Sequence, residues 1–167
     1  MTAPNGSKNN ASRIVKPGLL SAVVMAGALA GTMDLLAASL MYFIRTGKSP
    51  LDVLAYIASA VYGVEASEGN GWIYVTGLLF HYCIAYGWSF IFFVLYPKMA
   101  VLRNNKVASS VGYGLIVWCV MNLIVLPMTK IQVPPFDPVR ASMGATILIA
   151  CIGLPLSVLA HRFYAEK

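Results

Sequence analysis

Residues 19–44 read LLSAVVMAGALAGTMDLLAASLMYFI, a run in which Asp34 is the single charged residue. An α-helix rises about 1.5 Å per residue, so about 20 residues suffice to cross the hydrocarbon core of a bilayer. Three further apolar runs of sufficient length follow, at residues 72–96, 108–128 and 141–160. The sequence therefore predicts four membrane-spanning helices, of which residues 19–44 form the first.

The composition of the whole chain supports this prediction. Of its 167 residues, 59% are hydrophobic and 11% are charged, whereas soluble domains carry about 25% charged residues. The mean hydropathy is +0.73. We therefore predict an all-α membrane protein, a four-transmembrane-helix bundle, and exclude the class of soluble globular proteins. Residues 1–17 are expected to form a polar cytoplasmic tail, and residues 18–167 a single transmembrane domain.

The start of the first run also resembles a secretory signal peptide. Lys16 precedes the apolar stretch LLSAVVMAGALAG, in which Ala28 and Ala30 have the spacing of a cleavage site. The apolar run nevertheless continues to Ile44, well past that site. We expect the segment to be retained as the first span.

The net charge of +6 is distributed unevenly between the two sides of the predicted membrane domain. If the N-terminus lies inside, the outer side carries four charges of each sign, and the inner side carries eight cations and the single anion Glu166. The inner cations are Lys8, Arg13, Lys16, Lys98, Arg103, Lys106, Arg162 and Lys167. Such an excess follows the positive-inside rule, so both termini should be cytoplasmic. Membrane lipids, and no nucleic acid, are the expected partners of these basic residues.

A shorter apolar segment lies between the first two spans. Ser49, Pro50 and Asp52 form a pattern typical of a helix start, and apolar residues then recur as far as Tyr62. A helix over residues 50–64 is too short to span a bilayer and too apolar to stay in water. We predict a short outer helix that is interfacial or re-entrant.

Small and polar residues recur at steps of three or four in three of the predicted spans, so each set shares one helix face. The sets are Gly27, Gly31 and Asp34; Gly77, His81, Ala85 and Ser89; and Ser110, Gly114, Trp118 and Asn122. Faces of this kind allow transmembrane helices to approach closely. The glycines are therefore expected to form packing seams.

Two ionisable side chains lie at similar depth on these faces. Asp34 is ten residues from the outer end of its span and His81 is nine residues from the outer start of the next, roughly 14–15 Å into the membrane. A carboxylate at that depth is costly unless it is paired, protonated or hydrated. We predict that Asp34 faces the bundle interior and pairs with His81, with Asn122 somewhat shallower. In the alternative, Asp34 is protonated and hydrogen-bonded to Thr32 or to neighbouring backbone.

The remaining chemistry-bearing residues predict no cofactor and no metal site. Cys83, Cys119 and Cys151 fall inside predicted spans, without a CxxC motif or a cysteine–histidine spacing typical of metal ligands. His161 lies at the inner end of the fourth span, too far from His81 in depth for the two to hold one haem. Because no nucleophile or metal motif is present, an enzyme acting on lipid or quinone is the least supported function.

The loop before the fourth span, VPPFDPVR at residues 133–140, is stiffened by Pro134, Pro135 and Pro138. We expect the loop to hold Asp137 and Arg140 at the mouth of the bundle, with Asp137 capping the start of the span. In the alternative, the loop is a stiff connector that binds nothing.

Three motifs accompany His81: SFIFFVLYPK at residues 89–98, VGYG at residues 111–114, and LPMTKIQVPPFD at residues 126–137. In order and spacing, residues 78–138 resemble the YagU-like family of small bacterial inner-membrane proteins. The positions that match the family are His81, Pro97, Pro127, Pro134, Pro135 and Asp137. The family can have a histidine where this chain has Asn122, and Asp34 has no counterpart that aligns. The resemblance implies an inner-membrane location and a role in surviving acid stress.

Two functional hypotheses follow. In the first, the Asp34–His81 pair is a protonatable site, because histidine titrates near neutral pH. The protein is then a proton-linked transporter, a channel or an acid-stress factor. In the second, the pair only holds helices together, and the protein is a non-catalytic subunit or assembly factor of a larger membrane complex, or forms a homo-oligomer.

Overall fold

The computed structural model describes residues 18–63, 71–131 and 135–165. The tail at residues 1–17, the end of the predicted outer helix at Val64, and Pro134 lie outside the described residues. Four helices are long and apolar enough to cross a membrane: Leu19–Thr46, Gly71–Leu95, Lys106–Met128 and Pro138–Ala165. The described residues contain no strand, so the predicted all-α four-helix membrane bundle is confirmed.

Two of the spans are single α-helices and two are composite. The first and second spans are α1 (Leu19–Thr46) and α3 (Gly71–Leu95). The third span consists of α5 (Lys106–Val120), η2 (Met121–Val125) and η3 (Leu126–Met128). The fourth consists of α6 (Pro138–Leu148), η4 (Ile149–Gly153) and α7 (Leu154–Ala165). The shorter helices are α2 (Asp52–Tyr62) and α4 (Ala100–Asn104), and the sequence pattern does not predict α4.

Local sequence explains where several helices begin and end. Gly47 ends α1 with φ 66°, a conformation that glycine adopts without strain, and its N–H donates to the Phe43 carbonyl. Asn105 and Asp137 are the N-cap residues of α5 and α6. The side chain of each accepts hydrogen bonds from two backbone N–H groups of the first turn. Pro138 occupies the first turn of α6, where its missing N–H breaks no helical bond.

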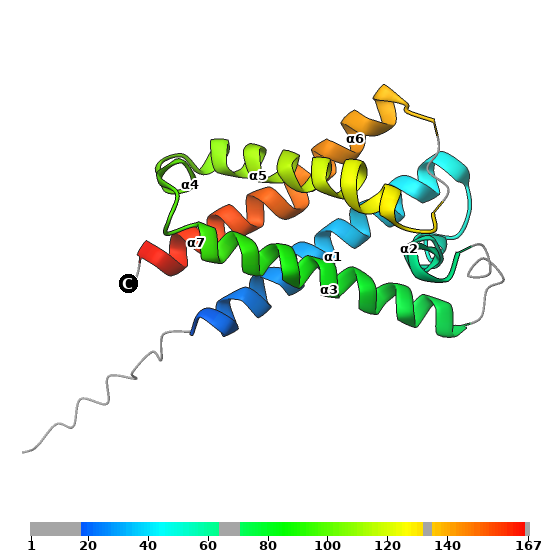
Figure 1. Cartoon of the computed structure of the whole chain (residues 1–167), viewed down its shortest axis with the longest axis horizontal. Helices are drawn as coiled ribbons and strands as arrows, with labels where there is room; N and C mark the ends of the chain where they lie inside the picture. Colours follow the sequence, from blue (N-terminus) through cyan, green and yellow to red (C-terminus); the bar gives the residue numbers. More distant parts are fainter. Residues whose placement is uncertain (1–17, 64–70, 132–134, 166–167) are drawn as a thin grey trace, which may run out of the picture.

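The spans form a bundle in which α1 packs along α3 and also against the fourth span. The third span packs against the fourth. Figure 1 shows the start of α1 and the end of α7 at the same end of the bundle as α4, with α2 at the opposite end. We refer to these two ends as the terminal end and the α2 end.

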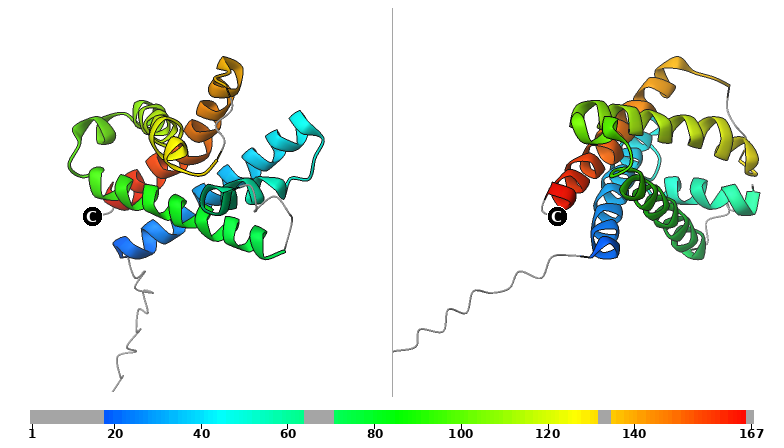
Figure 2. Two further views of the ribbon diagram at one scale, coloured as in Figure 1. Left: turned by 45° about the vertical axis from the view of Figure 1, so that its right-hand side comes forward. Right: turned by 60° about the vertical axis from the view of Figure 1, so that its left-hand side comes forward.

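The buried core lies toward the terminal end, where α3 and α5 meet. The ring centroids of Phe92 and Tyr113 are 4.6 Å apart, and the Tyr113 hydroxyl donates to the Trp88 carbonyl at 2.6 Å. Toward the α2 end, α3 and α5 spread apart, as the right-hand view of Figure 2 shows. The second and third spans are therefore neighbours at the terminal end and separated from each other at the α2 end.

The predicted packing seams are confirmed. A Cβ atom on Gly31 would lie 2.9 Å from the Cβ of Ala85, so α1 and α3 are in close contact. A Cβ atom on Gly114 would lie 2.5 Å from the Cα of Ile149, so the third span touches the backbone of η4. Both approaches depend on the missing side chain, as expected for small-residue faces between membrane helices.

The short helix α2 lies against the α2 end of α3. A Cβ atom on Gly77 would collide with the backbone carbonyl of Leu54, so the two helices meet backbone to backbone. The N–H of Lys130 donates to the Ala60 carbonyl at 3.1 Å, which ties the end of the third span to the same helix. α2 therefore bridges the divergence between the second and third spans, and its depth in the membrane stays a prediction.

Candidate intramembrane site

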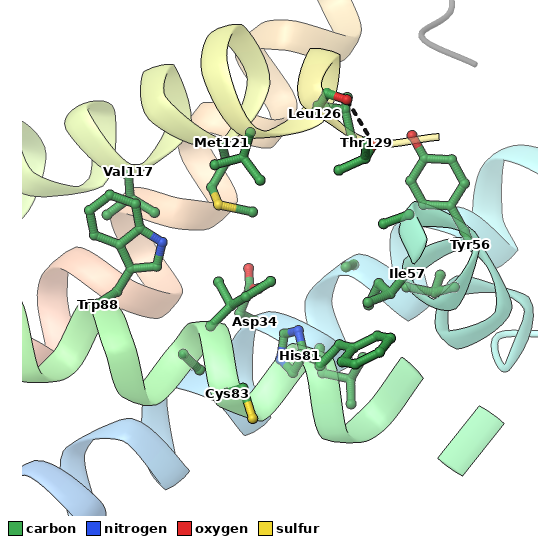
Figure 3. Close-up of a pocket in the computed structure, with 18 of the residues that line it drawn as sticks. Asp34, Tyr56, Ile57, His81, Cys83, Trp88, Val117, Met121, Leu126 and Thr129 are labelled. Atoms are coloured by element: carbon green, nitrogen blue, oxygen red, sulfur yellow. Dashed lines mark hydrogen bonds between the residues drawn. The ribbon is translucent and has the colours of Figure 1, made fainter. Parts of the chain in front are cut away.

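A cavity of about 590 Å³ lies between α1, α2, α3 and the third and fourth spans. Its volume falls within the range of small-molecule sites, about 300–1,000 Å³. Figure 3 shows α3 and the third span on two sides of the cavity and α2 at one end. Most lining side chains are apolar, and the lining includes no Lys or Arg among the described residues. The polar lining residues are Asp34, Tyr56, His81, Trp88, Asn122 and Thr129, together with the thiol Cys83.

Asp34 reaches the cavity from α1. Figure 3 shows its carboxyl group projecting into the space between α3 and the third span. Within the described part of the chain, no hydrogen bond or ion pair reaches this carboxyl group, and its oxygens are accessible from the cavity. A carboxyl group in a membrane interior must be paired, protonated or hydrated. Asp34 is therefore open to a proton, to water or to a ligand that enters the cavity.

His81 reaches the same cavity from α3. Its Nε2 lies 2.8 Å from the carbonyl oxygen of Gly31, about one turn before Asp34 on α1. A carbonyl oxygen can only accept, so Nε2 carries a proton and donates it. Nδ1 is then the unprotonated ring nitrogen of the neutral imidazole. The hydrogen bond holds the imidazole against α1.

The structure brings Asp34 and His81 to one cavity, near enough for their charges to attract each other. The direct hydrogen bond or ion pair that we expected between them is not formed in this structure. The Gly31 carbonyl takes its place as the partner of His81, because the contact of Gly31 with Ala85 brings the α1 backbone within reach. The two groups therefore face the same cavity without a direct bond between them.

The two supporting polar residues differ in their positions. Thr32 Oγ1 donates to the Ala28 carbonyl at 2.7 Å and lies 2.7 Å from the Tyr82 hydroxyl, so it joins α1 to α3 and does not bind Asp34. Asn122 does line the cavity, and its Nδ2 donates to the Trp118 carbonyl at 2.9 Å. Asn122 thus adds a polar group to the cavity wall, whereas Thr32 is outside it.

Asp137 and Arg140 lie at the α2 end, outside the cavity lining. Asp137 Oδ1 accepts the N–H groups of Val139 at 2.9 Å and Arg140 at 3.3 Å, so the predicted helix cap is confirmed. Its Oδ2 lies 3.7 Å from Arg45 Nη2 at the end of α1 and 3.9 Å from Arg140 Nε. The N–H of Arg140 contributes most to lowering the pKa of Asp137, and the Val139 N–H and the two guanidinium charges add to it. This cluster joins the first span to the fourth.

Several lining residues are not predicted from the sequence. Tyr56 comes from α2, Trp88 from α3 and Met121 from η2. Trp88 follows His81 by seven residues, so helical periodicity alone could have placed it on the same face. Tyr56 has no such signal, because its place depends on how α2 docks. Burial raises the pKa of the Tyr56 phenol and the Arg140 charge acts in the opposite direction, so the hydroxyl is un-ionised at neutral pH.

The third and fourth spans each contribute a π-helical segment to the cavity wall. η2 contributes Met121, Asn122 and Val125 to the lining, and η4 contributes Ile152. A π-helical turn changes which side chains share a face, and such turns occur frequently at functional sites. Both segments lie within stretches that the sequence pattern predicts to be ordinary α-helix.

Within the described residues, no cluster of three or more His, Cys, Asp or Glu side chains is arranged to hold a metal ion. The fold and the cavity define the class: a multi-pass helical membrane protein with a cavity between its helices that includes polar side chains. Comparisons of the chain with known protein families, with curated proteins and with solved structures find no match. Membership of the YagU-like family therefore stays a prediction.

Proposed function

We propose that the protein is a small proton-linked transporter of the bacterial inner membrane, in which Asp34 and His81 form the proton-binding site. One observation carries the proposal: two ionisable side chains from neighbouring spans face one cavity, and the carboxyl group has no partner among the described residues. Intramembrane ionisable residues typically mark proton or ion pathways. The resemblance to the YagU-like family supports the inner membrane and a role under acid stress.

The shape of the cavity favours a transporter over an open channel. The cavity extends from α2 as far as Trp88, Val117 and Ile152. Beyond these residues, toward the terminal end, the described side chains form a close-packed core in which Phe92 is 0% and Tyr96 2% exposed. A binding site that is reached from one side at a time is the property on which alternating access depends.

The site contains few groups that could respond to pH near neutrality. Besides Asp34 and His81, the titratable groups among the described residues that line the cavity or lie near Asp34 are Tyr56, Cys83 and Cys151. Phenols and thiols as classes titrate above neutral pH. Asp34 and His81 are therefore the two groups of the described site that we propose bind and release the proton.

Tryptophan fluorescence tests the proposal, because Trp88 lines the cavity. The emission of the purified protein in detergent should change between about pH 5 and 7, and Trp88→Phe should remove that change. Asp34→Asn and His81→Gln should each reduce the change, and the double variant should show none. His161→Gln is the matched control, because His161 is bound to the Tyr96 hydroxyl at 3.0 Å, outside the cavity lining.

Proton movement is measured next, in vesicles that contain the reconstituted protein and a pH-sensitive dye. Wild-type protein should dissipate an imposed pH gradient faster than the Asp34→Asn variant. The stabilities of the single and double variants should also be non-additive by about 0.5–3 kcal/mol, as for interacting residues. Non-additivity without any response to pH would contradict the proton site. The two residues would then only join α1 to α3, and a role as a non-catalytic subunit would be favoured.

A further inference from the structure

We propose that the cavity binds a lipophilic organic cation, with Asp34 as its counter-charge. This inference rests on the proposed function and deepens it, because the same carboxyl group would exchange a proton for the cation. Four features carry it: the charge of the site, its aromatic wall, its apolar mouth and its volume.

The charge of the site selects a cation. Asp34 is the one acidic residue among the described lining residues, and His81 is the one base, because the lining contains no Lys or Arg. The nearby guanidinium groups of Arg45 and Arg140 lie beside Asp137 at the α2 end, and neither lines the cavity. An ionised carboxylate in low-dielectric surroundings attracts a cation far more strongly than it would in water. An anion would meet the same carboxylate with repulsion.

Aromatic rings complete the recognition of a cation. Tyr56, Phe80 and Trp88 contribute rings to the wall, and Figure 3 shows Tyr56 and Trp88 on opposite sides of the space into which Asp34 projects. The faces of such rings attract organic cations, and tryptophan does so most strongly. Aromatic groups around a carboxylate suit a cation whose charge is spread over an apolar body.

The mouth of the cavity suits a ligand that arrives through lipid. Val61 of α2 and Ile84 of α3 line the cavity and are also 49% and 39% exposed, so apolar side chains that are accessible from outside form part of its rim. A hydrophilic solute would gain little from such a rim, whereas a lipophilic cation partitions into it. The volume of about 590 Å³ is sufficient for a drug-sized molecule.

The exchange conserves charge. When the carboxyl group of Asp34 is protonated, entry of a monovalent cation releases that proton and leaves an ion pair in the cavity. When the cation leaves, a proton returns to the carboxylate. Protons therefore compete with the cation for Asp34, so low pH weakens cation binding. The proton and the cation occupy the site in turn.

Two probe ions of nearly equal size and opposite charge test the inference: tetraphenylphosphonium, a cation, and tetraphenylborate, an anion. Wild-type protein in detergent should bind the cation above its partition into micelles, and should not bind the anion. Asp34→Asn should weaken binding of the cation by at least about tenfold, equivalent to 1.4 kcal/mol. Asp34→Glu should retain binding, and Asp52→Asn, a carboxylate outside the lining, is the matched control. Affinity for the cation should fall as the pH is lowered from about 8 to about 5.

A cavity-filling variant separates the cation site from the proton site. Met121→Phe, which adds no tryptophan, should fill part of the space beside Asp34 while leaving both Asp34 and His81 in place. We expect it to lose the cation and keep the fluorescence response to pH. Circular dichroism and gel filtration establish that each variant is folded.

Equal binding of both ions, or binding that is unchanged in Asp34→Asn, would overturn the inference and leave an apolar cavity that any lipid chain could fill. A pH response without cation binding would overturn the inference and leave the proton site standing. Cation binding that depends on Asp34, without a pH response, would support the cation site and contradict the proton-linked function.

Discussion

Ser109 of α5 carries a buried hydroxyl, 1% exposed, that has no hydrogen-bond partner among the described residues. Ser157 of α7 is equally buried, at 0% exposed, but its hydroxyl donates to the Lys106 carbonyl at 3.1 Å and so joins the fourth span to the third. The two serines differ in what their hydroxyl groups contribute, although their chemistry and burial are alike.

Alanine substitutions at these serines should therefore have opposite effects. Ser109→Ala removes an unsatisfied polar group and should raise the free energy of unfolding by about 1 kcal/mol. Ser157→Ala removes an interhelical hydrogen bond and should lower it by about 0.6 kcal/mol, the average for such bonds in membranes. Thermal unfolding in one detergent measures both. A loss of stability in Ser109→Ala would show that its hydroxyl has a partner.

Residue spacing alone predicts part of the site. The positions of Asp34 and His81 along their spans place them at one level, and the structure brings both to one cavity. Whether they touch depends on shifts of an ångström or so between α1 and α3, which the spacing does not determine. The actual partner of His81, the Gly31 carbonyl, is backbone and leaves no signal in the sequence.

The position of α2 depends on a close contact with α3 that a single added methyl group would disrupt. Gly77 of α3 meets the backbone of Leu54 directly, whereas Gly87, further along α3, has no atom within 4 Å of the place where its Cβ would be. Gly77→Ala should push α2 away and destabilise the protein by about 1–3 kcal/mol, as overpacking usually does. Gly87→Ala should be neutral or stabilising by up to about 1 kcal/mol, because alanine favours helix.

These two variants are compared by thermal unfolding and by tetraphenylphosphonium binding. Because α2 forms one end of the cavity, Gly77→Ala should weaken binding of the cation and Gly87→Ala should leave it unchanged. Similar behaviour of the two variants would contradict the backbone contact between α2 and α3.

Asp137 links the first and fourth spans, and its contribution to stability should depend on pH. Its pKa is lowered in the folded protein, chiefly by the Arg140 N–H. A lowered folded-state pKa means that the stabilisation is present above the unfolded value of about 3.9 and is lost as the pH falls through the lowered value. Asp137→Asn keeps an acceptor for the cap but loses the attraction to Arg45 and Arg140, so Asp137→Ala should be the more damaging change.

The melting temperatures of wild type, Asp137→Asn and Asp137→Ala should therefore follow that order at neutral pH. The difference in melting temperature between wild type and Asp137→Asn should disappear under strong acid, when the wild-type carboxyl group is also neutral. A gap that is independent of pH would contradict the electrostatic part of this explanation. If all three proteins melt alike, the loop is only a connector.

At the scale of the whole molecule, hydrophobicity predicts the number and approximate limits of the spans, because a bilayer imposes a minimum length on any crossing helix. It does not predict which spans are neighbours, since several faces carry small residues that would suit close packing. The π-helical segments η2 and η4 and the docking of α2 depend on tertiary contacts, as at Gly114 and Gly77. The cavity lies where η2, η4 and α2 meet, so its shape depends on the assembled bundle and is not predicted from the sequence of any one segment.

The orientation of the bundle in the membrane is a separate prediction that rests on charge. Lys98, Arg103, Lys106 and Arg162 belong to the terminal end, whose described residues carry no Asp or Glu to balance them. At the α2 end, Arg45, Lys48, Lys130 and Arg140 are accompanied by the anions Asp52 and Asp137. The terminal end should therefore face the cytoplasm.

Cysteine labelling in intact cells decides the orientation. In a background where Cys83, Cys119 and Cys151 are replaced by alanine, Lys48→Cys at the α2 end should react with a membrane-impermeant reagent, and Asn104→Cys at the terminal end should react only after permeabilisation. Both positions are exposed, so accessibility within the fold does not limit either reaction. The opposite pattern would reverse the orientation, and the cavity would then open toward the cytoplasmic half of the membrane. That result would also change the physiology expected of the site: a cavity near the outer surface meets external acid directly, whereas one near the cytoplasm would collect its proton from inside the cell.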